Sequence, residues 1–385
     1  MTVILVQGFD NVTAFVQLSR FSIYGRTGGS PEAIVAGRFG GNALQIGTTS
    51  LQPCRRYFNF SGLEELCTGV AFRLRTVVDN GSPTGFITFM ALAAGTTHRF
   101  NIQVDAVNGH LRLADGADAE ILTNTGVNLL GADWRYIEVY YLEDATNGRI
   151  IIWLDDDDTP AIDFTGDTSG ADITRVLLLD MYQASAHRAR NEFDDWYITT
   201  GERLGESRCV TLRPIDDDGE NEWTPSTPGD HYLMVDEQPT DEGATYLESA
   251  ATPGNAEAFD VQAFTDIGFE PAFIRALAVT LVAFESTSGN LRLRTLLRQA
   301  TDSFGASIHV PTSGYALTQT IYTNDPQTSA PWTRPGAQMA RCGFDVASGT
   351  TGVLRVSTAN ITILASTREA PRVQGRRRQT NVNTN

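Results

Sequence analysis

Apolar and polar residues alternate in short runs along the first half of the chain, and turn residues separate these runs. Alternation with a period of two is typical of strands that bury one face, as in antiparallel sheets. No long segment has the 3.6-residue period of a helix. The pattern predicts strands at residues 2–6, 69–76, 86–91, 99–104, 111–114, 136–142, 149–154 and 196–199.

Three Asn-Gly pairs stand among these runs, at Asn80-Gly81, Asn108-Gly109 and Asn147-Gly148. Asn-Gly supplies the positive φ angles that a two-residue type I′ hairpin turn requires. The third pair lies between YIEVYYL and RIIIWL, so the sequence predicts a hairpin most strongly there.

The pattern changes after residue 200. Residues 214–253 are rich in proline and aspartate, which predicts long ordered loops. A helix is the alternative for residues 274–284, but their β-branched content favours a strand. Further strands are expected at 290–297, 315–322, 340–345, 352–356 and 360–364. The chain is therefore predicted to be all-β, with one sandwich over residues 1–200 and a second over residues 201–365.

The net charge of the chain excludes some classes of binding partner. The 385 residues include 46 acidic residues and 29 arginines, without any lysine, for a net charge of −17. Nucleic acid and anionic membranes are bound by clustered positive charge, so neither is an expected partner. The N-terminus lacks the features of a signal peptide, and no apolar run approaches the roughly 18 residues of a membrane span. We expect a soluble protein that is not exported.

The C-terminal segment, residues 366–385, differs from the rest because it carries +4 while the remaining chain carries −21. Its low apolar content predicts a flexible tail. Two interpretations stay open: an arm that docks on an acidic neighbouring subunit, or a solvated tail. The residues that would make the attachment are Arg368, Arg372, Arg376, Arg377 and Arg378.

The four cysteines show neither CxxC spacing nor the density of a disulfide scaffold. Separate buried thiols are expected, and a disulfide between Cys54 and Cys67 is the alternative.

Two acidic clusters have the residue types that calcium binds, Asp155 to Asp158 after RIIIWL and Asp216 to Asp218 before Gly219. Calcium takes six to eight oxygen ligands, and neither cluster has EF-hand spacing. Turn capping by aspartate is the favoured interpretation, so no metal or cofactor is expected.

Glu192 and Asp194 are two residues apart in a predicted strand and therefore share one face. A retaining glycosidase needs two carboxyl groups roughly 5 Å apart. The pattern of jelly-roll glycosidases would place a third carboxylate at the next position of that face, where Trp196 stands instead. The five histidines form no HExxH motif, and GxSxG, Walker A and strand-linked GxGxxG motifs are absent, so no catalytic residue is predicted. GRFGGNAL, at residues 37–44, is expected to form a tight turn into a buried strand.

Several segments together carry a family resemblance: LVQGFDN, GRFGGNALQI, GVAFRLRT, ADWRYIEVYY and FDDWYITTG, followed by CVTLRPIDDDGENEWTPS, HYLMVDEQPTDEGATYLESA and NDPQTSAPWT. The first group resembles the concanavalin A-like (laminin-G-like) jelly-roll domain of tailed-bacteriophage structural proteins. The second group resembles the segments that follow this domain in such proteins. The resemblance extends over nearly the whole chain.

The resemblance implies a non-enzymatic virion component that is displayed externally as a neck or tail fibre, an appendage or a head-decoration protein. Its partners would be other virion proteins of the capsid, portal or tail and further copies of itself, with host surface glycans as a further contact. A carbohydrate-binding receptor-recognition module is the first alternative, with Trp223, Trp332 or Tyr232 as stacking platforms. A polysaccharide-degrading enzyme centred on Glu192 and Asp194 is the second.

Overall fold

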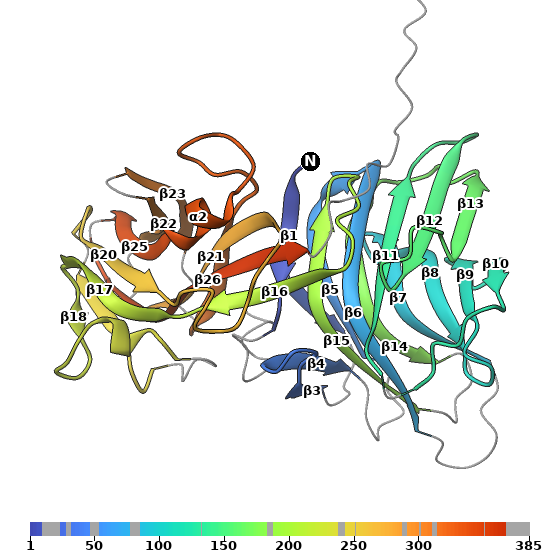
Figure 1. The fold of residues 1–385 in the computed structure, drawn as a ribbon, viewed down its shortest axis with the longest axis horizontal. Coiled ribbons are helices and arrows are strands. Elements are labelled where there is room, and N and C mark those ends of the chain that lie inside the picture. The colour runs from blue at the N-terminus through green and yellow to red at the C-terminus, as the bar shows by residue number, and fades with distance from the viewer. Residues whose placement is uncertain are drawn as a thin grey trace, which may run out of the picture.

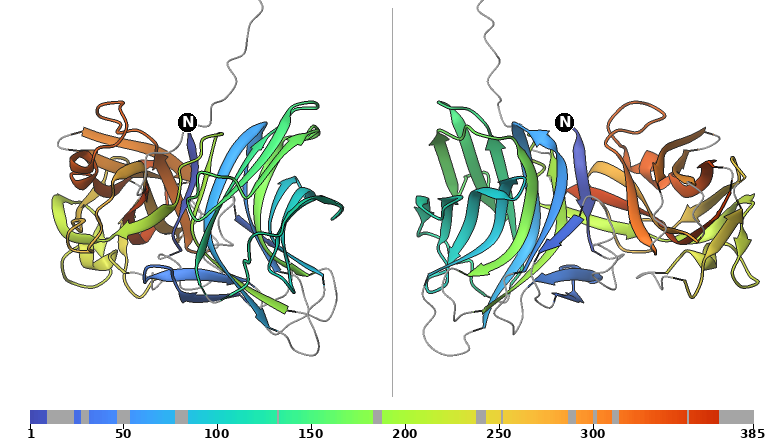
Figure 2. Two further views of the ribbon diagram at one scale, coloured as in Figure 1. Left: turned by 45° about the vertical axis from the view of Figure 1, so that its right-hand side comes forward. Right: turned by 180° about the vertical axis from the view of Figure 1, so that it is seen from behind.

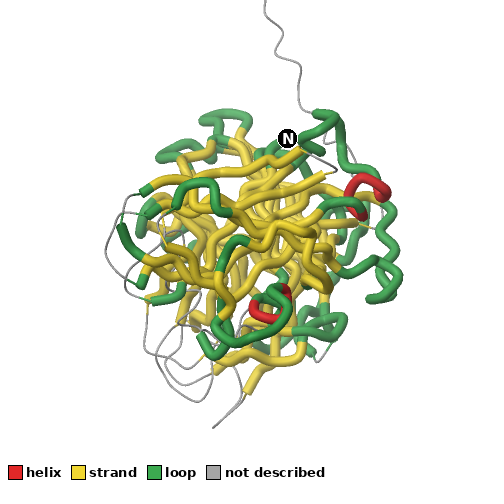
Figure 3. The backbone as a smooth tube through the Cα atoms, turned by 90° about the vertical axis from the view of Figure 1, so that its left-hand side faces the viewer, coloured by secondary structure: helices red, strands yellow, loops and turns green. Residues whose placement is uncertain are grey.

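A computed structural model describes most of the chain. The described residues are 1–9, 24–27, 32–46, 54–77, 85–131, 133–182, 188–237, 243–250, 252–286, 291–299, 302–309, 314–349 and 351–366. They confirm the all-β prediction, since strands fill the view of Figure 3 and the described helices are the short turns η1 (Tyr232–Met234) and α2 (Arg334–Gln338). In the described part, no helix is both long and apolar enough to cross a membrane.

Two antiparallel sheets form the first sandwich. In the described residues the larger sheet runs β13 (Ile162–Gly166), β12 (Gly148–Leu154), β11 (Arg135–Leu142), β6 (Glu65–Val77), β15 (Arg188–Thr199), β4 (Asn42–Ile46) and β3 (Glu32–Ala36), with β1 (Val3–Gln7) also paired to β15. The facing sheet runs β10 (Glu120–Asn124), β9 (Leu111–Asp115), β8 (Thr97–Asp105), β7 (Phe86–Ala94), β14 (Ile173–Tyr182), β5 (Cys54–Leu63) and β2 (Tyr24–Thr27).

Alternation buries one face of each sheet, as the sequence pattern predicts. Ile137, Val139 and Tyr141 of β11 point into the shared core. Across that core the rings of Phe72 and Phe89 stack with centroids 5.0 Å apart, which joins β6 of one sheet to β7 of the other.

The second sandwich follows the same plan. One sheet runs β18 (Thr224–Pro225), β19 (Leu247–Ala250), β26 (Val353–Ser366), β21 (Phe273–Glu285) and β24 (Ala316–Tyr322), with β16 (Ser207–Leu212) also paired to β26. The other runs β17 (Pro214–Asn221), β20 (Ala256–Val261), β25 (Arg341–Ser348), β22 (Arg292–Gln299) and β23 (Asp302–His309). Residues 274–284 are a strand, as expected, but 352–356 and 360–364 belong to the single strand β26 because both halves pair with β21.

The hairpin at Asn147-Gly148 is confirmed by the pairing of β11 with β12, but the predicted type I′ turn is wrong. Neither residue of the pair has a positive φ. Instead Asp144 Oδ1 accepts hydrogen bonds from the N–H groups of Thr146 and Asn147, both at 2.7 Å, and builds a longer loop. At the second pair only Gly109 has a positive φ, and Asn80-Gly81 lies outside the described residues.

The prediction of loops over residues 214–253 is wrong in part, because β17, β18 and β19 lie there. The carboxylates of β17 are stabilised by tertiary partners rather than by solvent alone. Asp218 pairs with Arg341 at 2.8 Å, and Glu220 pairs with Arg298 at 2.9 Å. Arginines of β25 and β22, further along the same sheet, thus supply the opposite charge to this acidic strand.

The two sandwiches lie side by side, and β1 and β16 run between them (Figures 1 and 2). A buried apolar cluster joins them and includes Val3 and Val6 of β1 together with Ala278 of β21 and Leu364 of β26. Two hydrogen bonds cross at the same place: Gln319 Nε2 donates to the carbonyl of Val6 at 3.1 Å, and the Val3 N–H donates to Thr323 Oγ1 at 3.1 Å. A buried apolar contact with hydrogen bonds favours a fixed orientation of the two domains.

Cys67, Cys209 and Cys342 are free and buried, so the disulfide alternative for Cys54 and Cys67 is wrong and separate thiols are confirmed for these three. Burial raises the pKa of the Cys67 and Cys342 thiols above the usual value. Both stay protonated and unreactive at neutral pH.

Candidate functional site

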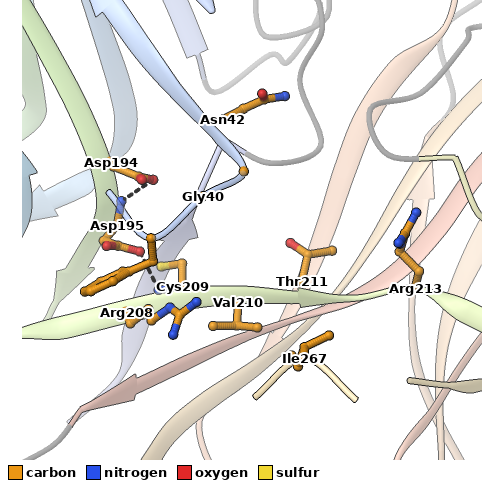
Figure 4. A pocket seen from close by; sticks show the side chains of 12 residues that line it. Gly40, Asn42, Asp194, Asp195, Arg208, Cys209, Val210, Thr211, Arg213 and Ile267 are labelled. Atoms are coloured by element: carbon orange, nitrogen blue, oxygen red, sulfur yellow. Dashed lines mark hydrogen bonds between the residues drawn. The ribbon is translucent and has the colours of Figure 1, made fainter. Parts of the chain in front are cut away.

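A pocket of about 270 Å³ opens at the junction of the two sandwiches (Figure 4). The first sandwich lines it with the turn between β3 and β4 and with the carboxylates at positions 194 and 195 of β15. The second sandwich lines it with β16 and with Ile267. Pockets between domains are frequent ligand sites because two surfaces can supply different groups to one space.

The turn at one wall is shaped by its glycines, as the sequence predicts. Ala36 pairs with Asn42, and between them Gly40 and Gly41 have φ angles of 93° and 64°. A Cβ on Gly37 would lie 2.7 Å from Asp194 Oδ2, so only glycine lets the turn approach β15 this closely. A Cβ on Gly40 would meet no atom within 4 Å, because this glycine borders open space.

A bulge in β15 places two carboxylates beside that turn. The register with β6 shifts between Asp194 and Tyr197, and Asp195 has a φ of 51°. Asp194 Oδ2 accepts the N–H of Arg38 at 2.9 Å, while Asp195 Oδ1 accepts the N–H of Cys209 at 2.7 Å. The two aspartates of the bulge therefore hydrogen-bond to two elements. Asp194 bonds to the glycine turn of the same sandwich, and Asp195 bonds to β16 of the second sandwich.

Arginines and aromatic rings alternate across the junction. The guanidinium carbon of Arg38 lies 5.5 Å from the ring centroid of Tyr136 and 4.8 Å from that of Phe39. The guanidinium carbon of Arg208 lies 4.5 Å from the Phe39 centroid and 5.2 Å from the Phe269 centroid. Cation–π contacts on two rings restrict the guanidinium of Arg208 without neutralising its charge.

The arginines of the pocket differ in their partners. Arg38 pairs with Glu206. Arg208, in contrast, forms no ion pair with a carboxylate of the described residues, although the chain is strongly acidic. Arg213 interacts electrostatically with Asp236. Figure 4 shows Arg213 and Thr211 projecting to one side of β16, and Arg208 and Val210 to the other, where Ile267 lies.

The outer edge of β16 adds a backbone donor. β16 pairs with β26 along one edge, and the N–H of Cys209 points the other way, to Asp195. The N–H of Arg213 also points outward and donates to Gln262 Oε1 at 3.2 Å. Because N–H direction alternates along an antiparallel strand, the N–H of Thr211 between them faces the pocket.

A buried ion pair holds the linker that leads into β16. Glu138 of β11 and Arg203 of the linker are 1 % and 2 % exposed, and their Nε–Oε2 distance is 2.6 Å. Glu138 also accepts the N–H of Gly205 at 2.8 Å and the hydroxyl of Tyr197. Burial raises the pKa of the Glu138 carboxyl, and Arg203 opposes that rise. These contacts fix where β16 enters the junction.

Glu192 and Asp194, on which the alternative of a polysaccharide-degrading enzyme is centred, are held by other groups of the first sandwich. Glu192 is 3 % exposed and pairs with Arg73, whose guanidinium stacks on Trp134 at 4.7 Å. Asp194 accepts backbone N–H groups, as described above. Neither carboxylate has the arrangement that a nucleophile facing a scissile bond requires.

Carboxylates of the acidic clusters accept backbone N–H groups, within the local turn for Asp157 and from distant segments for Asp155 and Asp217. Asp155 Oδ1 accepts the N–H of Tyr136 at 2.9 Å, and Asp157 Oδ1 accepts that of Thr159 at 2.9 Å. Asp217 likewise accepts the N–H groups of His231 and Tyr232. Residues 155–158 line a second, open cavity of about 580 Å³, but no group of three or more His, Cys, Asp or Glu in the described residues is arranged to hold a metal ion.

The predicted stacking platforms are wrong for both tryptophans. Trp223 and Trp332 are 3 % and 6 % exposed, and their indole N–H groups donate to backbone carbonyls. Tyr232 is half-buried against the same core. Phe39, which is 51 % exposed, is the aromatic residue at the pocket. The sequence contained a signal for this residue, because Phe39 is the single aromatic residue in the glycine-rich segment GRFGGNAL.

The five arginines of the predicted attachment segment, Arg368, Arg372, Arg376, Arg377 and Arg378, lie outside the described residues. Their role as an attachment site stays a prediction.

No protein-family model and no curated protein sequence matches the chain. Among solved structures, the cellulose-induced protein Cip1 is similar over 51 % of this chain and 96 % of its own, at 14 % identity and a TM-score of 0.36. The winged bean acidic lectin complexed with methyl-α-D-galactose covers 51 % of this chain and 98 % of its own, at 9 % identity and a TM-score of 0.34. The exoplasmic/lumenal domain of VIP36, in a Ca²⁺- and mannose-bound form, covers 49 % of this chain and 87 % of its own, at 11 % identity and a TM-score of 0.34.

These similarities concern fold alone. In the first sandwich of this chain, two antiparallel sheets face each other and the chain crosses repeatedly between them, as from β5 to β6 to β7. The chain is an all-β protein in which one antiparallel β-sandwich is followed by a second.

Proposed function

We propose that the chain is a carbohydrate-binding protein and that the junction pocket is its binding site. The observation that carries the proposal is the composition of this pocket. Asn42, Thr211 and Arg213 offer polar groups, while Phe39 and Ile267 offer apolar surface. A sugar presents hydroxyl groups at its rim and C–H groups on its faces, and sites for such ligands combine a few placed polar groups with apolar walls.

The size of the pocket also fits a single sugar residue. Its volume of about 270 Å³ lies just below the range of pockets for drug-sized ligands. The walls come from a glycine turn, a strand bulge and a strand edge that hydrogen-bond one another, so the pocket is formed before a ligand arrives. A preformed site loses less conformational entropy on binding.

We propose binding without catalysis, because the carboxylates that line the pocket accept backbone N–H groups and Glu192 pairs with Arg73. Some proteins with a similar fold are lectins, but at TM-scores of 0.30 to 0.36 the likeness adds nothing to the argument from the pocket. The location in a phage virion, the virion partners and the self-assembly that the sequence resemblance implies stay predictions.

A glycan array probed with the full-length protein tests the proposal. We expect binding to a restricted set of glycans, and an at least tenfold loss of affinity in Asn42→Ala because one placed polar group is removed. Asn124→Ala, at the second cavity, is the matched control and should bind as the unaltered protein does. Absence of glycan binding, or equal loss in both variants, would refute the junction pocket as a sugar site.

A further inference from the structure

Arg208 of the junction pocket is available to a ligand, whereas each carboxylate that lines the pocket accepts a backbone N–H group. Asp194 and Asp195 accept the N–H groups of Arg38 and Cys209 at 2.9 and 2.7 Å. Arg208 forms no ion pair with a carboxylate in the described part of the chain, whereas Arg213 interacts electrostatically with Asp236. Beside these two carboxylates, Arg208 therefore presents N–H donors and a positive charge that has no ion-pair partner, in a protein whose net charge is −17.

Arg208 is also held in position. Its guanidinium lies over Phe39 of the first sandwich at 4.5 Å and over Phe269 of the second at 5.2 Å. Stacking against rings uses the faces of the planar guanidinium and leaves its N–H edge free to donate. A guanidinium edge matches two oxygens of one oxyanion, and such bidentate pairs are the stronger hydrogen bonds of proteins.

Resting on the proposed function, we infer that the sugar bound in this pocket is acidic, with its carboxylate or sulfate ester bound by Arg208. The N–H of Thr211, at the outer edge of β16, supplies a further donor to the pocket. A neutral sugar would leave the charge of Arg208 without a partner in a partly desolvated pocket, which costs binding free energy.

Paired probes test this inference: a uronic-acid oligosaccharide with its carboxyl-reduced form, and a sulfated oligosaccharide with its desulfated form. We expect the full-length protein to bind the acidic member of at least one pair about 10- to 100-fold more tightly. Whichever pair shows the difference identifies the source of the oxyanion. Binding should weaken as salt concentration rises, because the interaction is between charges.

Variants assign the effect to Arg208. Arg208→Ala should reduce binding of the acidic probe about 10- to 100-fold and leave binding of its neutral partner nearly unchanged. Arg208→Lys keeps the charge but loses the planar fork, so it should recover only part of the affinity. Arg149→Ala, which removes an exposed arginine paired with Asp163, is the matched control, and thermal unfolding verifies that each variant folds.

The outcomes separate the two proposals. Equal binding of acidic and neutral partners that still depends on Asn42 would overturn the inference and leave the sugar site standing. A preference for acidic probes that survives in Arg208→Ala would overturn the role of this arginine. Binding of no probe and no array glycan would overturn the proposed function itself.

Discussion

At the scale of single residues, buried ionisable side chains occur where several neighbouring groups hydrogen-bond to them. Glu257 is fully buried and accepts the N–H of Trp223 at 2.6 Å and a hydrogen bond from His231 Nδ1 at 3.0 Å. Burial raises its pKa to about 7, and Asp217 adds to that rise while His231 opposes it. The carboxyl group thus connects β20 to the segment around η1. The free energy needed to keep it buried depends on its protonation, and therefore on pH.

This raised pKa predicts a pH-dependent stability. Below about pH 4.5 Glu257 is protonated in both folded and unfolded chains, and its contribution is fully present. As the pH rises to about 7, only the unfolded chain releases the proton, so the free energy of unfolding falls. Glu257→Gln has no proton to release, and the difference in stability between the unaltered protein and this variant should therefore decline over that range.

Urea unfolding followed by tryptophan fluorescence at a series of pH values measures this difference. The comparison cancels the general effect of pH on an acidic protein, because both chains share all other charges. A difference that stays constant with pH would contradict the assignment to Glu257.

At the scale of elements, close approach between strands depends on glycines, which have no side chain, as much as on the side chains that pack between strands. Gly69 of β6 lies opposite Tyr197 of β15, and a Cβ at this glycine would lie 2.3 Å from Cε1 of the tyrosine. Tyr197 cannot move aside without loss, because its hydroxyl donates to Glu138 and accepts the N–H of Leu204 at 3.2 Å.

We therefore expect Gly69→Ala to destabilise the protein by about 1–3 kcal/mol, the usual cost of overpacking. Gly126→Ala makes the same chemical change in a loop, where the nearest atom to the new Cβ is the Asn124 side-chain oxygen at 3.2 Å. Its effect should be well below that of Gly69→Ala. Urea midpoints of the two variants measure this contrast, and equal shifts would argue against a tight contact at Gly69.

The elements also show how far pattern predicts local structure. The alternating runs around residues 136–142 and 149–154 are strands, because a half-buried sheet demands that alternation. β17 carries PIDDDGEN and has no such pattern, and its strand conformation depends on pairing with β20 and on arginines of β22 and β25. Local sequence could not predict it, since its partners come from distant segments.

At the scale of the whole molecule, the two sandwiches share a core across their junction. Ala276, Ala278 and Leu364 of the second sandwich are fully buried in one cluster with Val6 and Tyr197 of the first. Small side chains on β21 allow the two sheets to approach, and the cluster excludes water from the contact. Unfolding of either sandwich would expose this surface on the other.

The two sandwiches should consequently unfold together in one calorimetric transition. Ala278→Asp buries an unpaired charge at the junction and should separate the transition into two. Asp substitution at the exposed Val107, a loop residue that is 57 % exposed, is the control and should leave one transition. Two transitions in the unaltered protein would contradict a shared core.

The candidate site was only partly predictable from the sequence, because its walls come from both sandwiches. GRFGGNAL indicated a tight turn, and that turn forms one wall of the pocket. The contact between Phe39 and Arg208 joins residues from different sandwiches, and no short motif records it. The tryptophans at positions 223 and 332 looked equally suitable from composition, but burial removed them from the surface.

By itself the sequence determined the all-β class, the strands with strict alternation, the turn at residues 37–41 and the acidic character of the body. Each of these follows from local periodicity, backbone freedom or summed charge, which a linear chain already contains. Tertiary structure alone decided which backbone N–H groups the buried carboxylates accept, which aromatic residue is exposed at the pocket and that Arg208 has no ion-pair partner. These properties depend on distances between residues far apart in sequence, because burial and charge pairing act through space rather than along the chain.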